Sequence, residues 1–459
     1  MLKKLVKAED IYEVAWVKRT MEYETLIPGF HEEAANDTNG TLKKYGIPLK
    51  EEAVSYYPPI LEDGLVKMRP VYQDPAALKY AEFMDNKYHM REELKILNVP
   101  TNKAMKKWRD RQIGRCAMEL GAKYQALVQA NFAIEMSEGC SVGCEFCGLN
   151  AGRLKSVFRY NEENSRLFKD VLRAGKDIIG DSAGYSTLYF ASEPLDNPDY
   201  ELFLKDYREV FNTLPQITTA TATRNIDRLR GLLKELNEDG TMVYRFSLTS
   251  LEATKKIFEE FTPEELVLVE LLPQYEEAPG CSLVDVGRKG EKDGEYEDTI
   301  SCISGFVLNM CTHKIRLTTP TWASKEHPTG EYILDEDVFE DGEDLRRILN
   351  EMIKKHMPEI IKPKERLRLR KGLTLKEREN DILICAPKGT EYRVLIDQRS
   401  NEAYKEMIKC VSEEFRTKRE ICKEFLERTG SQGGGFEMVY FIINKLWAMG
   451  ILETESGII

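Results

Sequence analysis

Three cysteines, Cys140, Cys144 and Cys147, lie within eight positions of one another. The residues between them are mostly small or polar, so a loop can curl around a metal centre, whereas a helix or a strand would send the thiols in different directions. Three close thiolates can hold an iron–sulfur cluster and leave one of its four irons without a protein ligand. The other seven of the ten cysteines are scattered, which suits a reducing compartment and favours metal binding over a disulfide here.

Strand and helix patterns alternate from about residue 132 onward, where short apolar runs are separated by charged amphipathic segments. This alternation favours strand–helix units around a parallel sheet, a fold of the α/β class. Residues 130–135 are the predicted first strand and deliver the cysteine loop at its carboxyl end, the edge where active sites of barrel-like α/β folds lie. Further predicted strands are 186–191, 216–222 and 244–249, and predicted helices are 164–178, 200–212, 225–236 and 252–260.

The chain divides into four predicted parts: a helical region (1–125), the strand–helix units (126–330), a helical linker (331–380) and a compact tail (381–459). In the second part, 287–294 is a predicted loop, and 299–309 forms a β-hairpin with 314–319. A predicted helix covers 335–357. The tail is predicted to contain a hairpin of 382–386 and 392–396, helices over 401–414, 417–428 and 436–449, and a closing strand at 450–453.

The size and charge of the chain narrow the range of functions. Its 459 residues suffice for two or three domains. The net charge of −12 argues against binding to nucleic-acid phosphates. No apolar stretch approaches the length of a membrane span, and the charged start lacks the apolar run of a signal peptide. We therefore expect a cytoplasmic protein whose partners include neither nucleic acid nor membrane.

The Cys-x3-Cys-x2-Cys spacing, with Phe146 directly before the last cysteine, resembles the cluster motif of radical S-adenosylmethionine (radical SAM) enzymes. The resemblance implies a partial (β/α)6-type barrel and a [4Fe-4S] cluster held by Cys140, Cys144 and Cys147. It also implies that S-adenosylmethionine chelates the fourth iron. An electron from a donor such as flavodoxin or ferredoxin would then cleave this cofactor to methionine and a 5′-deoxyadenosyl radical.

Enzymes of this type carry a Gly-Gly-Glu-Pro-like segment after the second strand, where the backbone meets the cofactor's amino group. The matching place here is residues 191–194, Ala-Ser-Glu-Pro, in which small residues replace both glycines. The resemblance thus makes Ser192 and Glu193 cofactor-binding candidates alongside Phe146, although an ordinary strand-to-helix turn is the alternative. Arg245 and Ser247 share one face of a predicted strand. That face could meet the cofactor's carboxylate and ribose, or hold an ion pair inside the barrel.

The tail resembles a winged helix-turn-helix, and more closely the PqqD-like peptide-recognition elements fused to enzymes that modify ribosomally made peptides. A DNA-reading helix needs outward Arg, Lys or Asn, but residues 436–447 are mostly apolar with a single Lys. An exposed edge strand could instead accept the leader of a ribosomal precursor peptide by β-augmentation. A purely structural cap is the alternative.

Two segments, 189–200 and 299–310, look like regions of the proteusin-type radical SAM peptide epimerases. This resemblance implies conversion of L-residues to D-residues in the core of a precursor peptide. The deoxyadenosyl radical would remove the α-hydrogen, and a second donor must return hydrogen from the opposite face. Other radical modifications of a peptide, such as thioether or carbon–carbon crosslinking, remain open. So does a cluster-bearing regulatory or peptide-binding protein without catalysis.

A thiol suits the role of the returning donor because its S–H bond is weak enough to give hydrogen to a carbon radical. Cys302 is the first candidate and Cys311 the second, since both lie in a part of the chain that we expect to close over the catalytic edge. The role needs a protonated thiol, so a depressed pKa would count against it. The alternative for Cys302 is an ordinary core cysteine.

Overall fold

The computed structural model describes residues 2–54, 60–62, 65–67, 74–239, 244–378, 382–394, 401–411, 414–430 and 436–457. The chain is a mixed α/β protein whose central element is a sheet in two runs. In one run the strands lie in the order β11 (Glu331–Val338), β10 (Lys314–Pro320), β9 (Ile303–Asn309) and β3 (Ala130–Glu135). The other run is β6 (Thr218–Thr219), β7 (Tyr244–Leu248) and β8 (Val269–Pro273).

Thr187 joins the two runs, because it forms parallel bridges with Ala133 of β3 and with Gln216 before β6. From β3 to β8 the parallel segments therefore follow the order of the sequence, as in a (β/α) barrel. β9 pairs in parallel with the other side of β3, and β10 and β11 continue antiparallel. No barrel closure is formed by the described residues, since β8 and β11 stand at opposite ends of this order.

Helices cover the outer face of the sheet because alternate residues of its strands are large and apolar. Phe132 and Ile134 of β3, together with Phe306 and Leu308 of β9, belong to the main buried core. The covering helices are α8 (Glu162–Ile179), α9 (Tyr200–Phe211), α10 (Ile226–Asp239), α11 (Leu251–Glu260) and α13 (Gly342–His356). They confirm the predicted helices to within a few residues at most ends. The opposite face holds a smaller apolar cluster of Ala133, Phe190, Ile303 and Val307.

Two predicted strands are much shorter than expected because side chains take their backbone donors. In 186–191, the backbone N–H of Ala191 donates to the Glu135 carboxylate at 2.7 Å instead of to a neighbouring strand, and Thr187 alone pairs. In 216–222, the N–H of Ala220 donates to the Glu193 carboxylate at 2.8 Å. Short 3-10 turns flank these segments, η3 (Asp181–Gly184) and η4 (Pro194–Asp196).

The predicted loop at 287–294 is wrong, since residues Gly287–Asp293 form helix α12. Its first turn is fixed from outside: the N–H of Arg288 donates to the Cys147 carbonyl at 3.1 Å. The predicted helix over 335–357 is wrong in its first residues, which belong to β11 and pair with β10. α13 begins at Gly342, where the Asp341 carboxylate accepts from two backbone N–H groups of the first turn. The hairpin predicted from 299–309 and 314–319 is confirmed as β9 and β10, except that the first strand begins at Ile303 and not at residue 299.

The N-terminal region is helical, as predicted. Its longest helices are α2 (Ile11–Leu26), α6 (Pro75–Leu97) and α7 (Lys103–Leu120). α2 packs along α6, and the Leu26 carbonyl accepts from the Tyr275 hydroxyl at 2.5 Å. The remaining elements are α1 (Leu2–Leu5), η1 (Ala8–Asp10), α3 (Phe30–Asn36), α4 (Thr38–Lys44), α5 (Glu51–Val54), β1 (Ile60–Glu62), β2 (Leu65–Lys67) and η2 (Ala122–Gln125).

The tail has its own buried core and contains the elements that the sequence predicts. β14 (Ile382–Cys385) and β15 (Glu391–Val394) form the hairpin, with β13 (Thr374–Glu377) on the other side of β14. β13 lies in the predicted helical linker (331–380), which is therefore not helical throughout and adds a strand to the sheet of the tail. Residues 395 and 396 of the predicted second strand lie outside the described ranges. The helices are α14 (Asn401–Cys410), α15 (Lys418–Thr429) and α16 (Phe436–Ala448). A separate small sheet combines β12 (Arg366–Leu369), β16 (Arg416–Thr417) and the closing strand β17 (Leu452–Thr454).

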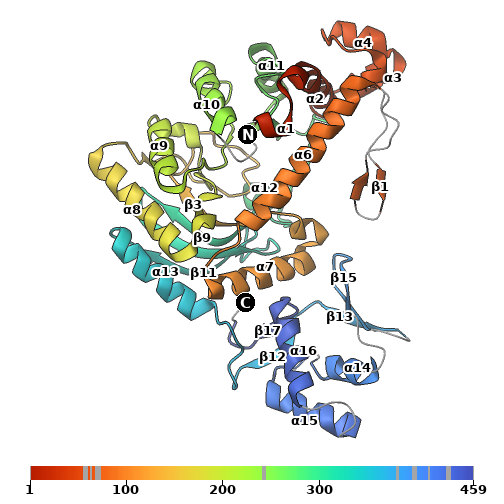
Figure 1. Ribbon diagram of the computed structural model, residues 1–459, viewed down its shortest axis with the longest axis vertical. Coiled ribbons are helices and arrows are strands. Elements are labelled where there is room, and N and C mark those ends of the chain that lie inside the picture. Colours follow the sequence, from red (N-terminus) through yellow and green to blue (C-terminus); the bar gives the residue numbers. More distant parts are fainter. Residues whose placement is uncertain are drawn as a thin grey trace.

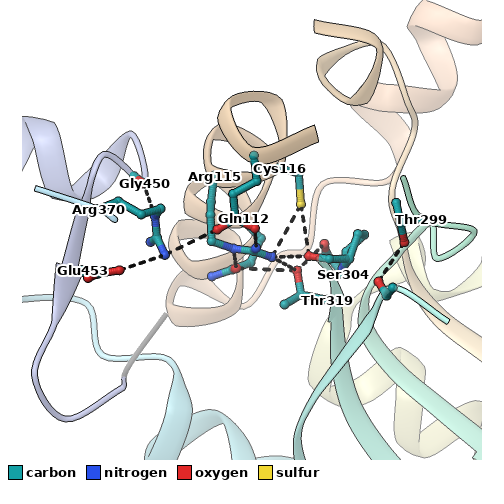
Figure 2. Close-up of polar contacts among 12 residues, drawn as sticks. Gln112, Arg115, Cys116, Thr299, Ser304, Thr319, Arg370, Gly450 and Glu453 are labelled. Carbon is teal, nitrogen blue, oxygen red and sulfur yellow. Dashed lines mark hydrogen bonds and ion pairs between the residues drawn. The ribbon is translucent and has the colours of Figure 1, made fainter. Parts of the chain in front are cut away.

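Helix α7 lies between the sheet and the tail (Figure 1). From its middle, the buried Arg115 donates to the Gln112 side chain at 2.9 Å and to the Thr319 hydroxyl of β10 at 3.1 Å, as Figure 2 shows. On the tail side, the buried Arg370 donates to the Gly450 carbonyl at 3.0 Å. The Arg111 guanidinium stacks 3.9 Å above the Trp447 ring of α16. One helix thus holds both units through buried arginines.

Candidate metal and cofactor site

The cysteine loop follows β3 at its carboxyl end, as predicted. A short pair of strands, β4 (Ser137–Glu138) and β5 (Ser156–Val157), closes its base. Gly139 has a φ of +84° and lies so close to the Arg153 carbonyl that a Cβ would overlap it. Two backbone N–H groups donate to sulfur, that of Val142 to Cys140 and that of Ala151 to Cys147, both at 3.4 Å. The loop therefore presents its sulfurs as acceptors, which suits thiolate ligands.

The three thiols are half-buried and influence one another electrostatically. Burial raises the pKa of Cys144 to about 11, with further contributions from Cys147 and Cys140. Bringing three thiolates together therefore calls for a cationic group between them. In the part of the chain that the structure describes, no three His, Cys, Asp or Glu side chains could hold one metal ion. A [4Fe-4S] cluster binds each cysteine through a different iron, so its ligands need not converge on one point. The residues present fit such a cluster.

Two residues that sequence reasoning missed hold the loop in place. The Asp196 carboxylate of η4 accepts from the backbone N–H of Ser141 at 2.8 Å and from its hydroxyl at 2.5 Å. The Arg288 guanidinium of α12 donates to the carbonyls of Cys144, at 2.6 Å, and Ala151. Asp196 lies in the 189–200 segment singled out from the sequence, so the sequence could have indicated a role for it. Arg288 lies in a segment predicted to be a loop, and nothing in the sequence indicated its contact with the cysteine loop.

A cavity of about 880 Å³ adjoins the cysteine loop at the carboxyl edge of the sheet. Its wall includes Cys144 and Phe146 from the loop, with residues that directly follow three parallel segments: Ala220 after β6, Thr249 and Ser250 after β7, and Gln274 and Tyr275 after β8. Its volume lies in the range of small-molecule and cofactor sites. Phe146 is thus the predicted cofactor-binding residue that lines this cavity.

The turn at 191–194 reaches the same edge, but its one carboxylate, that of Glu193, is hydrogen-bonded to other residues of the chain. Glu193 is buried and accepts from the Thr219 hydroxyl at 2.6 Å, as well as from the backbone N–H groups of Leu195 and Ala220. Burial raises the pKa of Glu193. The Glu193 carboxylate therefore joins η4 to β6. These contacts are those of an ordinary strand-to-helix turn, which was the alternative interpretation of this segment. Ser192 is half-buried in the same turn.

Arg245 and Ser247 lie on one face of β7, since burial alternates along this strand as predicted. Arg245 forms an ion pair with Glu270 at 2.8 Å, and Lys87 of α6 contacts the same carboxylate at 2.7 Å. Although burial alone would raise it, Lys87 and Arg245 lower the pKa of Glu270 to about 2. Arg245 thus forms an ion pair, with Glu270, as the alternative interpretation of this residue expected. It lines a second cavity, of about 370 Å³, and not the cavity beside the cysteine loop.

Cys302 directly precedes β9 at its amino end, whereas the cysteine loop begins at the carboxyl end of β3. β9 runs parallel to β3, with Ile303 beside Ala130 and Asn309 beside Glu135. The seven steps from Cys302 to Asn309 span on the order of 20 Å at about 3.3 Å per residue. The segment around Cys302 nevertheless reaches the cysteine loop, since a Cβ on Gly148, directly after Cys147, would lie 3.1 Å from the Ile300 side chain. Cys302 is exposed at the wall of the 370 Å³ cavity.

Cys311 lies on the other side, in the turn after β9. Its thiol faces the Met136 carbonyl at 3.8 Å, and its side chain packs against the main core under the outer helices. The surrounding protein atoms disfavour the thiolate form and raise the pKa of both candidate thiols, with Arg245 opposing the effect at Cys302. Both are therefore protonated at neutral pH. Cys302 has access to a cavity and Cys311 is close to the cysteine loop, and neither has both properties.

These features define a mixed α/β chain with a three-cysteine loop and a large cavity at the carboxyl edge of its parallel strands. No family model matches the sequence. The uncharacterized protein y4wI of Sinorhizobium fredii is 30% identical over 395 residues, which cover 83% of this chain and 75% of that protein. The chain belongs to the same family as y4wI.

Among solved structures, a crystal structure of BtrN in complex with AdoMet and 2-DOIA covers 41% of this chain and 72% of its own, with 16% identity and a TM-score of 0.30. A likeness at this level carries no argument about fold or function. Within the described ranges, no helix is both long and apolar enough to span a membrane.

Proposed function

We propose that the chain is a radical SAM enzyme acting on a peptide. The observation that carries this proposal is the pairing of the cysteine loop, whose sulfurs accept backbone hydrogen bonds, with the 880 Å³ cavity at the same edge of the sheet. Cys140, Cys144 and Cys147 would hold a [4Fe-4S] cluster, and the cavity would hold S-adenosylmethionine against Phe146. Together these groups supply a one-electron cleavage whose product abstracts hydrogen from carbon. The electron would come from a flavodoxin or a ferredoxin.

Residues around the loop position the ligands. Asp196 and Arg288 anchor the two halves of the loop from η4 and α12 through hydrogen bonds to its backbone. Thr249 and Ser250 line the cavity wall after β7, and the Ser250 hydroxyl also accepts from the Ala253 N–H at the start of α11. Ser192 stands in the turn that the radical SAM resemblance assigns to the cofactor's amino group.

The reaction that we favour is epimerisation of an L-residue to a D-residue. Removal of the α-hydrogen leaves a near-planar carbon radical, and a thiol returns hydrogen from the opposite face. The donor must therefore lie across the substrate from the cofactor. Cys302 is the first candidate for this donor: it is protonated and exposed at a cavity wall, and the Ile300 side chain two residues earlier lies against Gly148 of the cysteine loop. The cofactor and the substrate residue together would have to fill the space between the cysteine loop and Cys302. The sulfur radical left behind is restored by one electron and one proton from an external reductant.

Cys311 is the second donor candidate, supported by its place near the cysteine loop. Crosslinking of the peptide is the other enzymatic reaction that the same site could support, since it also begins with hydrogen abstraction. The sheet that β13 forms with the hairpin of the tail supports a peptide as the partner. β13 is an edge strand of the β13–β14–β15 sheet and three of its four residues are exposed, so an extended leader could pair with it.

The test is anaerobic reconstitution with iron and sulfide, followed by reductant and S-adenosylmethionine. An enzyme of this class releases 5′-deoxyadenosine, and the Cys144→Ala variant does not. A chain that binds iron but releases none is a binding or regulatory protein, and the proposal fails.

The reaction type is read from the peptide product in deuterated water. Epimerisation adds one deuteron per converted centre, whereas crosslinking removes hydrogen. Cys302→Ala should abolish the deuterated D-residue, while Cys311→Ala should leave it. The reverse pattern would assign the donor role to Cys311.

A further inference from the structure

The 370 Å³ cavity lies between helix α6 and the amino ends of the parallel strands. Residues at or near the starts of four strands form one side of it: Ala130, Gln216, Arg245 and Glu270. None of its lining residues also lines the 880 Å³ cavity beside the cysteine loop. Its volume is near the lower end of the range for small-molecule sites, which favours a small occupant. The cavity is therefore a site separate from the one proposed for the cofactor.

One face of α6 brings apolar and cationic side chains together in this cavity. The lining residues on that face recur at intervals of three and four positions: Met84, Lys87, Tyr88, Arg91 and Leu94. This spacing places them along one side of the helix. Leu127 and Val128, from the segment before β3, add further apolar surface. The wall is thus neither wholly apolar nor wholly charged, and it suits a ligand that has an apolar body and one charged group.

The charged groups of the wall leave a surplus of positive charge. Lys87, Arg91 and Arg245 are cations, and Glu270 is the single carboxylate among the lining residues. Lys87 and Arg245 share this carboxylate, at 2.7 and 2.8 Å. One negative charge therefore stands against three positive ones. An anion entering the cavity would reduce this imbalance, whereas a cation would increase it.

Both arginines of the wall have hydrogen-bond donors to spare. Arg245 donates to Glu270 through Nε, and its two terminal nitrogens make no hydrogen bond to a described residue. The Arg91 guanidinium lies 5.3 Å from the centre of the Tyr88 ring, and the carboxylate nearest to it among the described residues, that of Glu92, is 4.0 Å away. Guanidinium N–H groups match the two oxygens of a carboxylate. A carboxylate in the cavity would therefore find donors that no other acceptor occupies.

We propose that this cavity is a binding site for a small monocarboxylate with an apolar body, such as a short aryl or alkyl acid. The carboxylate accepts hydrogen bonds from the terminal nitrogens of Arg245 and is attracted by Arg91. The apolar body lies against Met84, Leu94 and Leu127. An uncharged analogue loses the ionic contact, and a cationic analogue meets like charge from the same arginines. Binding needs neither cluster nor cofactor, so the site is additional to the proposed function and does not depend on it.

Protection of Cys302 from alkylation tests this proposal, because its exposed thiol lines the same cavity. The full chain is treated with iodoacetamide at mildly alkaline pH, and modification of each cysteine is followed by mass spectrometry. The probe is 4-phenylbutyrate, whose dissociation constant is measured by calorimetry. At a concentration near twice that constant, it should slow Cys302 modification about threefold. Cys385 in the tail should react at one rate throughout.

Three analogues separate the charge of the probe from its apolar body. 4-Phenylbutanamide has the same shape without the charge, 4-phenylbutylamine is a cation, and acetate is the carboxylate without the apolar body. At the concentration used for 4-phenylbutyrate, none of the three should slow Cys302 modification measurably. This pattern would show that both the carboxylate and the apolar body are needed.

Two arginine variants form a matched pair. Arg91→Gln and Arg173→Gln each remove one cation, and the two side chains are 48% and 47% exposed. Arg173 lies on α8 and does not line the cavity. Arg91→Gln should weaken the binding of 4-phenylbutyrate about threefold, as expected for a partly exposed ion pair. Arg173→Gln should leave the affinity unchanged.

Glu270→Gln should change the affinity in the opposite direction. The substitution removes the carboxylate that Lys87 and Arg245 share, so both cations become available to the ligand. The affinity for 4-phenylbutyrate should rise about threefold or more, even though the protein loses stability. General damage to the fold would lower the affinity together with the stability, so the sign of the change distinguishes the two explanations.

Several results would overturn the proposal. These are equal protection by 4-phenylbutyrate and its amide, protection by the amine, an equal effect of the two arginine variants, and weaker binding in Glu270→Gln. Protection by the peptide acid acetyl-Gly-Gly-Phe without protection by 4-phenylbutyrate would assign the cavity to the end of a peptide and overturn the assignment to a small molecule. Release of 5′-deoxyadenosine is measured without these probes, so failure here leaves the proposed function untouched.

Discussion

The carboxylate of Asp196 accepts two hydrogen bonds from Ser141, one from its backbone N–H at 2.8 Å and one from its hydroxyl at 2.5 Å. Ser141 stands between the first two cysteines of the loop, and Asp196 ends the turn that follows the Thr187 bridge. Arg224, which follows β6, donates to the same hydroxyl at 3.1 Å. The loop after β3 is thus tied to the ends of the next two parallel segments.

We expect Asp196→Ala to weaken iron retention. Each hydrogen bond to a charged group contributes about 1.5–3 kcal/mol, so losing both should loosen the loop and lower cluster retention roughly tenfold or more. Iron and sulfide per chain, measured after reconstitution and a chelator challenge, report the effect. Asp199→Ala is the control, since Asp199 lies three residues away and binds Arg159 and the Tyr160 N–H instead of the loop. Equal iron loss in both variants would contradict the role of Asp196.

Local patterns sufficed for the elements whose partners are nearby in sequence. β3, β7, α8 and α9 show their apolar periodicity directly, and the cysteine loop is recognisable from spacing alone. The predicted strand at 186–191 is not formed over its full length, because the N–H of Ala191 donates to a side chain distant in sequence, Glu135. Helix α12 was not predicted, because its glycine-rich sequence is typical of a loop and its start is fixed by contact with Cys147.

The candidate site was predicted in its composition but not in its arrangement. Nothing in the residues around Cys302 indicates that β9 pairs with β3, some 170 positions earlier, or that the pairing is parallel. That single topological fact places Cys302 at the amino edge. Arg245 and Glu193 were chosen as cofactor-binding candidates, and their partners in the structure, Glu270 and Thr219, come from pairing that local sequence does not reveal.

Cys302 should react with iodoacetamide only at alkaline pH. Its pKa lies above the ordinary value of 9.0 because the protein atoms around the thiol disfavour the thiolate, while Arg245 partly offsets this. The thiolate fraction, and with it the alkylation rate, therefore has its midpoint above pH 9. Arg245→Gln removes the favourable cation and should move the midpoint further upward. Ser247→Ala, on the same face of β7 and without a charge, should leave it unchanged. A midpoint below pH 9, or a downward shift of the midpoint in Arg245→Gln, would contradict the raised pKa of Cys302 or the stabilisation of its thiolate by Arg245.

Glu270→Gln should destabilise the protein in a pH-dependent way. The folded-state pKa of Glu270, about 2, lies below its usual value of 4.5, so the charged carboxylate contributes stability above pH 4.5 that is lost as the pH falls toward 2. Near neutral pH the variant should lose about 2–3 kcal/mol, because Lys87 and Arg245 lose their shared partner. Urea unfolding between pH 3 and 7 should show the gap narrowing on acidification. Glu259→Gln, an exposed change on α11, should show no such gap.

Arg115→Met should lower stability by about 3–5 kcal/mol, the usual cost of removing one partner from a buried polar network. The change leaves the Gln112 amide oxygen and the Thr319 hydroxyl without this donor and leaves Glu119 without one of its arginines. The midpoint of urea unfolding measures the loss. Lys106→Met, at an exposed Lys106–Asp110 pair on the same helix, should shift the midpoint by less than about 1 kcal/mol. Similar losses in both would mean that α7 does not join the sheet and the tail through Arg115.

Gly305→Ala should damage the strand pair that positions the cysteine loop. A Cβ on Gly305 of β9 would overlap the backbone carbonyl of Asn131 in β3, at the point where the pairing register shifts. Backbone cannot rotate away as a side chain can, so β3 must move, at a cost of about 1–3 kcal/mol. Gly231→Ala, in helix α10 where no described atom lies within 4 Å, should instead stabilise by about 0.5–1 kcal/mol. Because β3 ends in the cysteine loop, Gly305→Ala should also lose iron, measured per chain after reconstitution, while Gly231→Ala should not. Normal iron content with lowered stability would mean that the loop is held by Asp196 and Arg288 independently of the β3–β9 register.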